Sequence, residues 1–200
     1  MKKFLHVGCG VNTKSSTTKG FNTADWLEIR YDIDKSVNPD YVGSMTDMGV
    51  IDDGSVEGIF SSHNIEHLYA HEVPLALAEF FRVLNDDGVV VVTCPDLKSV
   101  CELVGQDMLT ETVYESPAGP IAPIDMLYGY RPDLQQGKLF MAHRCGFTEK
   151  VLSGTFQAAG FMSNATMSRG APYFDLWGVI TKSKRSDEEL KEIAEENFPV

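Results

Sequence analysis

Apolar runs of strand length alternate with polar turns along the first part of the chain. Four such runs predict strands, because each is short and bounded by turn residues. They cover residues 3–10 (KFLHVGCG), 26–34 (WLEIRYDID), 39–45 (PDYVGSM) and 56–62 (VEGIFSS). The first run closes with glycines, which predict a tight turn, and the second closes with acids.

The periodicity becomes helical at residues 71–84 (HEVPLALAEFFRVL), where apolar side chains recur every three or four positions. Gly88 follows in NDDG and predicts the C-terminal cap of this helix. Residues 89–95 (VVVVTCP) are an unbroken, mostly β-branched run. Such a run is typical of a central parallel strand that is covered on both faces.

A second helix is predicted at residues 146–161, with Thr148 as its N-cap and Gly160 at its end. Two strands follow, near residues 162–168 and 174–182. Strands that alternate with helices and close with a strand pair indicate an α/β fold. We therefore predict a three-layer, mostly parallel sheet with an antiparallel C-terminal hairpin.

The alternation lapses in residues 96–146, which include the Pro-, Gly- and Tyr-rich stretch SPAGPIAPIDMLYGYRPD. Open α/β sheets bind ligands at the carboxyl ends of their strands, so we interpret this segment as a lid or substrate-recognition insertion. A structural excursion that covers a sheet edge is the alternative. The pocket candidates, for each of which simple packing is the alternative, are Tyr114, Tyr128, Tyr130 and Arg131.

One domain is expected over residues 1–183, followed by an acidic tail or helix at 184–200. The amphipathic spacing of this tail favours a surface or packing role over partner binding. The formal charge of −12 argues against a nucleic-acid surface and an anionic membrane. No apolar run approaches the ~18 residues of a membrane span, and the N-terminal run is too short for a signal peptide. We therefore expect a cytoplasmic protein with four reduced cysteines.

A glycine loop and an acid stand at two adjacent strand ends. Gly8, Cys9 and Gly10 follow the first strand, and Asp32 ends the second. Glycines there let the backbone approach a ligand, and an acid there accepts hydrogen bonds from both ribose hydroxyls of a nucleoside. The chain continues as VNTKSSTTKGFNTADW, without an apolar helical stripe. A short or missing first helix is therefore expected, which disfavours a dinucleotide.

The chain resembles class I S-adenosylmethionine-dependent methyltransferases of the type-11 group in five motifs that keep the family's order. They are FLHVGCG, YDID, GSMTDMGVIDDGSVEGIFSSHNIEHL, FFRVLNDDGVVVVTCPD and HRCGFTEKVLSGTFQAAGF. The resemblance implies a Rossmann-like three-layer sheet, here with reduced first helices, and S-adenosyl-L-methionine as the cofactor.

The resemblance also implies roles for individual positions. The cofactor-binding set is Gly8, Cys9 and Gly10 for the methionine portion, Asp32 for the ribose, Ile33, Ser44 and Met45 for the adenine, and Ser62 and His63 for the methyl-donor end. Ser44 stands where the family commonly has an acid, so Asp47 or a backbone amide could substitute. Because the third glycine is absent, the methionine carboxylate could be held by Lys14, Ser15 or Ser16.

The stretch SSHNIEHLYAH places His63, His67 and His71 at helical spacing, with Glu66 beside them. Taken alone, it matches a metal-binding pattern on one helix face. The resemblance instead explains Glu66 and His67 as residues that open a helix beside the cofactor. Pro74 predicts a new helix start, which takes His71 off this face. We therefore expect no metal.

His143, in MAHRCGFT, stands where similar family members place a histidine close to the substrate. A neutral imidazole there could take the proton from a hydroxyl as the methyl group arrives. A histidine that holds the lid by a hydrogen bond is the alternative, and His63 is the rival base. A zinc or iron site from His63, Glu66, His67 and His143 is chemically allowed, whereas imidazole ligands argue against magnesium.

We expect methyl transfer to an O or N nucleophile of a small molecule or glycan, without a nucleic-acid partner and without a membrane. Two other classes stay open. One is a non-catalytic, cofactor-binding regulatory relative. The other is a metal-dependent methyltransferase or hydrolase built on His63, Glu66 and His67.

Overall fold

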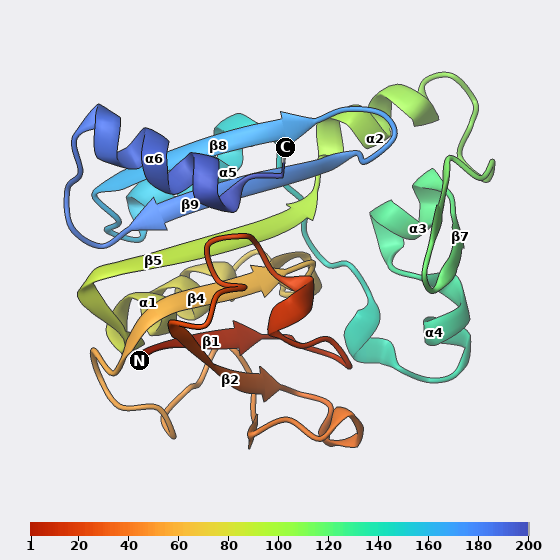
Figure 1. Ribbon diagram of the computed structural model, residues 1–200. Helices are drawn as coiled ribbons and strands as arrows, with labels where there is room; N and C mark the ends of the chain where they lie inside the picture. Colours follow the sequence, from red (N-terminus) through yellow and green to blue (C-terminus); the bar gives the residue numbers. More distant parts are fainter. Residues whose placement is uncertain (200) are drawn as a thin grey trace.

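A computed structural model describes residues 1–199. Seven strands form one sheet in the order β3-β2-β1-β4-β5-β9-β8 (Figure 1). The strands are β1 (Lys2–Val7), β2 (Trp26–Asp32), β3 (Tyr41–Val42), β4 (Val56–Ser62), β5 (Leu84–Pro95), β8 (Ser163–Arg169) and β9 (Asp175–Thr181). Strands β1 to β5 pair in parallel, and β9 runs antiparallel to both β5 and β8. The predicted sheet with its antiparallel C-terminal hairpin is confirmed.

Two helices, α1 (Val73–Val83) and α5 (Glu149–Ala158), cover the rear face of the sheet in Figure 1. Their apolar sides, with Leu77, Phe80 and Phe156 fully buried, pack into the larger core cluster against the strands. This burial explains the helical spacing of apolar residues in both segments.

The ends of these two helices test the predicted caps. The Thr148 hydroxyl accepts the N–H of Val151 at the start of α5. Gly160 follows the helix with a φ of 95°, which a glycine adopts without strain. The predicted cap of α1 is wrong, because α1 ends in extended backbone at Leu84 and Gly88 lies inside β5.

The front face is covered by α6 (Asp187–Asn197) and by the chain between β1 and β2 (Figure 1). Phe21 from that segment and Ile193 from α6 pack into a second cluster built on Phe4, Phe60 and neighbouring strand residues. The Thr18 hydroxyl donates a hydrogen bond of 2.6 Å to the buried Asn197 side chain. The predicted amphipathic tail helix therefore forms and packs as part of the front layer.

The connections after β1 and β2 contain only the 3₁₀ turns η1 (Lys14–Ser16) and η2 (Lys35–Val37). This confirms the predicted reduction of the first helices. A loop in place of a helix leaves the carboxyl ends of both strands open to a ligand.

Residues 96–146 contain more regular structure than the sequence predicted. They form α2 (Leu97–Val104), the hairpin strands β6 (Tyr114–Ser116) and β7 (Gly119–Ile121), α3 (Pro123–Tyr128), α4 (Arg131–Gln135) and the 3₁₀ turn η4 (Leu139–Met141). This insertion has its own small core, which includes Val100, Ile121 and Met126. It stands beside the carboxyl ends of the parallel strands (Figure 1). Within residues 1–199, none of the helices combines the length and the apolar character that a membrane crossing requires.

Candidate active site

A cleft of about 480 Å³ opens at the carboxyl ends of β1, β2 and β4. Its lining includes eight of the nine predicted cofactor-binding residues: Gly8, Gly10, Asp32, Ile33, Ser44, Met45, Ser62 and His63. Cys9 is the exception, because it is fully buried and does not line the cleft. The sheet thus brings together residues from four strand ends that are far apart in sequence.

Both glycines of the loop have a left-handed backbone, and Gly8 is in addition crowded by a neighbouring side chain. Gly8 has a φ of 63° and Gly10 has a φ of 53°, values that disfavour other residues. A Cβ atom on Gly8 would overlap the side chain of Asn64, whereas a Cβ on Gly10 would meet nothing within 4 Å. The Asn64 amide donates to the carbonyl oxygens of Val7 and Ser62, so it ties the end of β1 to the end of β4.

Asp32 is almost fully buried and holds the glycine loop by its backbone. Its carboxylate accepts the N–H of Gly10 at 2.7 Å and the N–H of Asp34 at 2.8 Å. Each carboxylate oxygen has a second lone pair, so ribose hydroxyls can still donate to it. The network fixes the orientation of the carboxylate in advance of binding.

Arg30 braces the same loop and was missed by the sequence analysis. Its guanidinium donates to the carbonyl oxygens of Gly10, Asn12, Val37 and Asn38. Arg30 and Asp32 are two positions apart on β2 and therefore share one face of the strand. That spacing is the signal that could have identified Arg30.

The end of the cleft where the resemblance predicts an adenine is lined by Ile33 and Met45 and has Ser44 where the family commonly has an acid. Ile33 has 57 % of its surface exposed in the cleft, beside Met45. The Ser44 hydroxyl is occupied by Thr46 at 2.7 Å. The residues considered as substitutes, Asp47, Lys14, Ser15 and Ser16, do not line the cleft in the described part of the chain. Two cationic side chains do line the cleft, Lys138 and Arg144, and both come from the C-terminal part of the insertion.

The stretch SSHNIEHLYAH does not form one helix. It contains the single 3₁₀ turn η3 (Ile65–His67), and α1 begins only at Val73 with Pro74 in its first turn. His71 stacks on Tyr69 at 5.7 Å between ring centroids and leaves the cleft. The interpretation of three histidines on one helix face is wrong, and the helix start predicted from Pro74 is confirmed.

Glu66 is buried directly behind His63. Its carboxylate is 1 % exposed, and its Oε1 lies 3.4 Å from Nδ1 of His63. Burial alone would raise the pKa of Glu66, but the interaction with His63, supported by His67 and His143, outweighs burial and lowers it. Burial likewise acts to lower the pKa of His63, and the interaction with Glu66 raises it above the ordinary value.

His143 reaches this turn from the far end of the insertion. Its ring stacks edge-on against His67 with 4.9 Å between centroids. Nδ1 of His143 donates to the carbonyl oxygen of Met126 at 2.7 Å. Burial lowers the pKa of His143, so its ring favours the neutral form.

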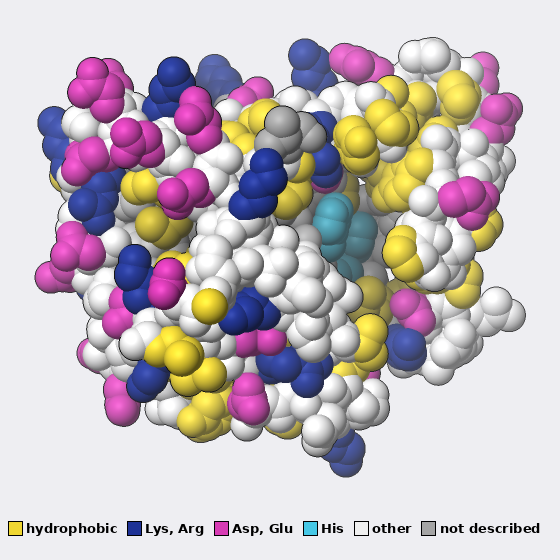
Figure 2. All heavy atoms as spheres, in the orientation of Figure 1, with side chains coloured by type: hydrophobic (Ala, Val, Ile, Leu, Met, Phe, Trp, Pro, Cys, Tyr) yellow, Lys and Arg dark blue, Asp and Glu magenta, His cyan; other side chains and the backbone are white. Residues whose placement is uncertain are grey.

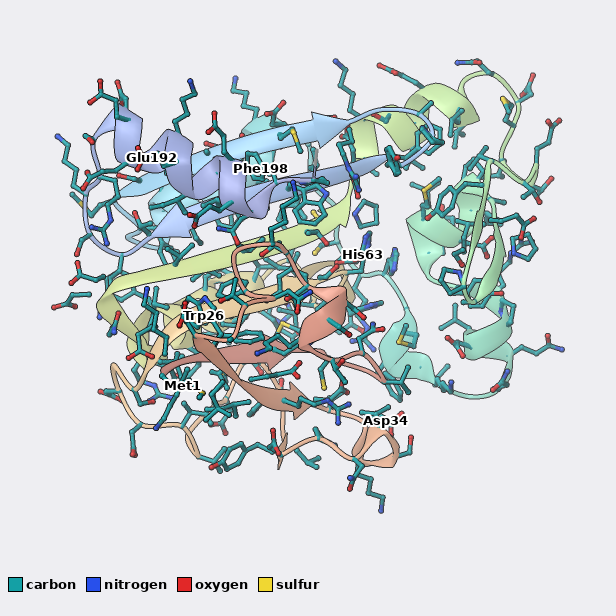
Figure 3. The ribbon with its side chains drawn as sticks, viewed as in Figure 1. Met1, Trp26, Asp34, His63, Glu192 and Phe198 are labelled. Carbon is teal, nitrogen blue, oxygen red and sulfur yellow. The ribbon has the colours of Figure 1, made fainter. Side chains whose placement is uncertain are left out.

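A second cavity of about 420 Å³ lies between this turn, the insertion and the start of β9. It shares His63, His67, Asp133 and Met141 with the first cleft. The remaining polar or aromatic lining includes Glu66, Tyr114, Ser116, Asp125, Tyr130, His143, Tyr173, Phe174 and Asp175. Figure 2 shows histidine side chains in the hollow between the body and the insertion, and Figure 3 shows His63 at that boundary.

The four pocket candidates of the insertion separate into two pairs. Tyr114 and Tyr130 line the second cavity. Tyr128 is 62 % exposed and borders a smaller neighbouring cavity. Arg131 makes a two-pronged ion pair with the buried Asp125 and so holds the insertion together. Of the four, only Tyr114 and Tyr130 therefore border the second cavity.

Comparison with protein families decides what this architecture is. A family model described as a methyltransferase domain, of the type-11 group, matches residues 5–92. Over these residues the chain is similar to a type-11 methyltransferase domain. The protein is an S-adenosylmethionine-dependent methyltransferase, and S-adenosylmethionine is its cofactor. None of the curated proteins matches the methyltransferase in sequence.

Solved structures share the fold of the methyltransferase at low sequence identity. A methyltransferase from Methanosarcina mazei has a TM-score of 0.59 and 13% identity, covering 92% of this chain and 93% of its own. The 1,6-didemethyltoxoflavin-N1-methyltransferase of Burkholderia thailandensis, with bound 1,6-didemethyltoxoflavin and S-adenosylhomocysteine, has a TM-score of 0.56 and 12% identity, covering 92% and 72%. A Haloferax volcanii methyltransferase in complex with the Trm112 activator has a TM-score of 0.56 and 12% identity, covering 92% and 83%.

The chemistry of the first cleft fits the cofactor. Gly10 leaves space for close approach, the Asp32 carboxylate can accept from ribose hydroxyls, and Ile33 exposes an apolar surface to an adenine ring. The cofactor supplies a sulfonium-bound methyl group that is open to nucleophilic attack. The residues of the cleft would orient it and exclude water.

Proposed function

We propose that the methyltransferase transfers a methyl group to an O or N nucleophile of a small molecule or single glycan unit bound in the second cavity. The observation that carries this proposal is the junction of the two cavities at His63 and His67. A cofactor in the first cleft and an acceptor in the second would meet at this junction. The volume of about 420 Å³ lies within the range of small-molecule sites.

The lining of the second cavity supports a polar acceptor of limited size. The Tyr114 hydroxyl can hydrogen-bond a hydroxyl or amine, and Tyr173 and Phe174 offer flat apolar surfaces. The hydroxyls of Tyr130 and Ser116 donate to the carbonyl oxygens of Ala118 and Gly119, so they are left as acceptors. The net charge of −12 disfavours a polyanionic acceptor such as a nucleic acid.

His63 and His143 remain the predicted proton acceptors, because both border the second cavity. Glu66 lies behind His63 on the Nδ1 side, which leaves Nε2 as the far nitrogen of the ring. The sulfonium makes the methyl group reactive, so placing the nucleophile in line with it is the larger task of the site.

A fractionation experiment tests the acceptor class. The purified protein is incubated with S-adenosylmethionine labelled in the methyl group and with a cell extract separated into small-molecule, nucleic-acid and protein fractions. We expect label to enter the small-molecule fraction. Label found only in nucleic acid or protein would contradict the proposal. Binding of S-adenosylhomocysteine without any transfer would instead favour the regulatory alternative.

Variants separate the roles of the two cavities. Tyr130→Phe and Tyr114→Phe are expected to lower transfer while S-adenosylhomocysteine affinity stays unchanged. Tyr128→Phe, an exposed tyrosine of the same insertion that lines neither of these two cavities, is the matched control. Equal losses of transfer in all three variants would show that the second cavity is not the acceptor site.

A further inference from the structure

Three side chains that can ligate a metal converge where the turn Ile65–His67 meets the end of the insertion. They are Glu66, His67 and His143, and one ligand-capable atom from each lies within 4.8 Å of the other two. We propose that these residues bind a divalent transition-metal ion of the Zn²⁺ type, with His63 beside it. This inference goes beyond the proposed methyl transfer, which requires no metal. With the metal bound, His143 is a ligand, and His63 is the one of the two predicted proton acceptors that keeps this role.

Glu66 provides the first argument. Its carboxylate is 1 % exposed, and neither of its oxygens has a hydrogen-bond partner among residues 1–199. Native proteins pair such buried carboxylates with donors, cations or metal ions, because an unpartnered buried charge is strongly unfavourable. His63 approaches only to 3.4 Å. A divalent cation in contact with Glu66 would neutralise this charge.

The hydrogen bond of His143 provides the second argument. Because Nδ1 donates to the carbonyl oxygen of Met126, the lone pair of the neutral ring lies on Nε2. A backbone carbonyl that fixes the tautomer in this way is the usual support of a metal-binding histidine. The same carbonyl also fixes the orientation of the ring.

His67 provides the third argument. Its Nδ1 lies 3.3 Å from the carbonyl oxygen of Ala142, and its Nε2 lies 3.1 Å from that of His63. The protonated ring can donate to both carbonyl oxygens, but the neutral form, which is the one that binds a metal, has one N–H and sets a nitrogen lone pair against one of them. Turning that lone pair toward a cation would remove the repulsion.

The backbone holds the two halves of this cluster together. The N–H groups of Arg144 and Cys145 donate to the carbonyl oxygen of Glu66 at 2.8 and 3.3 Å. The Cys145 thiol donates to the carbonyl oxygen of Ile65 at 3.4 Å. The segment that carries His143 is therefore fixed on the turn that carries Glu66 and His67.

The ligand set indicates the class of metal. Two imidazoles and one carboxylate suit Zn²⁺ and similar borderline ions, whereas Mg²⁺ prefers oxygen ligands. Bonds of 2.0–2.1 Å to a common tetrahedral ion require ligand atoms about 3.3 Å apart. Side-chain rotation can close the difference from 4.8 Å. Three protein ligands also leave a coordination position open, which would favour an acceptor with an oxygen donor if the proposed function holds.

The first test is a metal titration of the full, tag-free chain after chelator treatment. We expect one equivalent of Zn²⁺ to bind, and Co²⁺ to give the visible absorption of a four- or five-coordinate site. Glu66→Gln and His143→Ala should lower Zn²⁺ affinity at least about 10- to 100-fold, the loss seen even for supporting residues of metal sites. His71→Ala, an exposed histidine outside the cluster, should bind like the parent. Parent-like binding in Glu66→Gln and His143→Ala, or a preference for Mg²⁺, would overturn the proposal.

The second test uses the parent protein, so it does not depend on whether a variant folds. Nitrogen-15 NMR of the five histidine rings should show Zn²⁺-dependent shifts at His67 and His143 and none at His6 or His71. Unchanged His67 and His143 signals at saturating Zn²⁺ would overturn the metal site. S-adenosylhomocysteine binding, measured on the same samples, reports separately on the cofactor cleft, so failure of one inference is distinguishable from failure of the other.

Discussion

At one end of the active-site cleft, Asp32 accepts backbone N–H groups from Gly10 and Asp34, and Arg30 braces the surrounding loops. At the other end of the site, in the lining of the second cavity, Glu66 is more deeply buried but has no hydrogen-bond donor within the described chain, and imidazoles surround it. Both carboxylates stand at the carboxyl edge of the same sheet. They differ in whether the protein itself completes their hydrogen bonds.

The difference separates two ways of preparing a site. A carboxylate that the backbone already satisfies is rigid, and it offers only its spare lone pairs to a ligand. A buried carboxylate that lacks donors is unfavourable on its own, so it is kept where another charge is to be bound or moved. The Asp32 carboxylate is thus held in place before a ligand binds, whereas the Glu66 carboxylate is left without donors.

The glycine loop gives the largest expected effect. Gly8→Ala should lower the free energy of unfolding by about 3 kcal/mol, because it combines a left-handed backbone with overlap against Asn64. Gly10→Ala has the same backbone cost without the overlap and should lose only about 1 kcal/mol. Urea unfolding of both variants measures the difference. Equal losses would show that the contact with Asn64 contributes nothing.

Asp32→Asn tests whether the Asp32 carboxylate binds the cofactor. Loss of the charge weakens hydrogen bonds from ribose hydroxyls, each worth about 1.5–3 kcal/mol to a charged acceptor. We expect S-adenosylhomocysteine affinity, measured by calorimetry, to fall about 10- to 100-fold. The control is Asp52→Asn, which makes the same charge change at an exposed position. An unaltered affinity in Asp32→Asn would remove this residue from the cofactor site.

Glu66→Gln tests, in the metal-free protein, how much the buried Glu66 carboxylate contributes to stability. Removing a buried charge relieves its desolvation, and this gain offsets most of the lost attraction to His63. Stability should therefore stay within about 1 kcal/mol of the parent in chelator-treated samples. Asp125→Asn, which breaks a buried carboxylate's bonds to Arg131, should cost about 1.5–3 kcal/mol. If Glu66→Gln lost as much as Asp125→Asn, the contrast between the two ends would be wrong.

His6 gives the smallest expected effect, beneath the glycine loop. Burial lowers the pKa of His6, although Glu28 at 2.7 Å opposes this shift. The unfolded chain therefore binds the proton first as the pH falls below about 6.5, and stability decreases toward acid. His6→Gln should show a shallower decrease in the urea midpoint between pH 7.5 and 5. Parallel profiles for parent and variant would show that His6 does not contribute to acid sensitivity.

The sequence predicts the position of Asp32 and its glycine loop better than the surroundings of Glu66. Gly8, Gly10 and Asp32 follow strands whose apolar pattern is clear, so their place at one sheet edge follows from the fold. The apolar pattern does not predict the hydrogen bonds of Arg30, because its partners are backbone carbonyls of neighbouring loops. Only its spacing from Asp32 on β2 points to it.

The sequence allows a metal site that includes Glu66, His67 and His143, but local spacing does not show that the chain brings these three residues together. Helical periodicity groups His67 with His71, but Pro74 starts a new helix and the chain forms only a short turn before it. His143 joins this turn through backbone hydrogen bonds from Arg144 and Cys145, which any residue types could make. The helices α3 and α4 of the insertion are hidden for a related reason, since each has Pro in its first turn and is only six or five residues long, too short to establish a period.

The bond between Thr18 and Asn197 joins residues 179 positions apart and clamps α6 over the segment that leaves the glycine loop. Contacts of such long sequence separation close slowly during folding, because a large loop must be ordered before they form. The sheet and its rear helices can assemble from nearer neighbours. We therefore expect the cofactor end of the cleft to gain hydrogen-exchange protection last, when α6 docks.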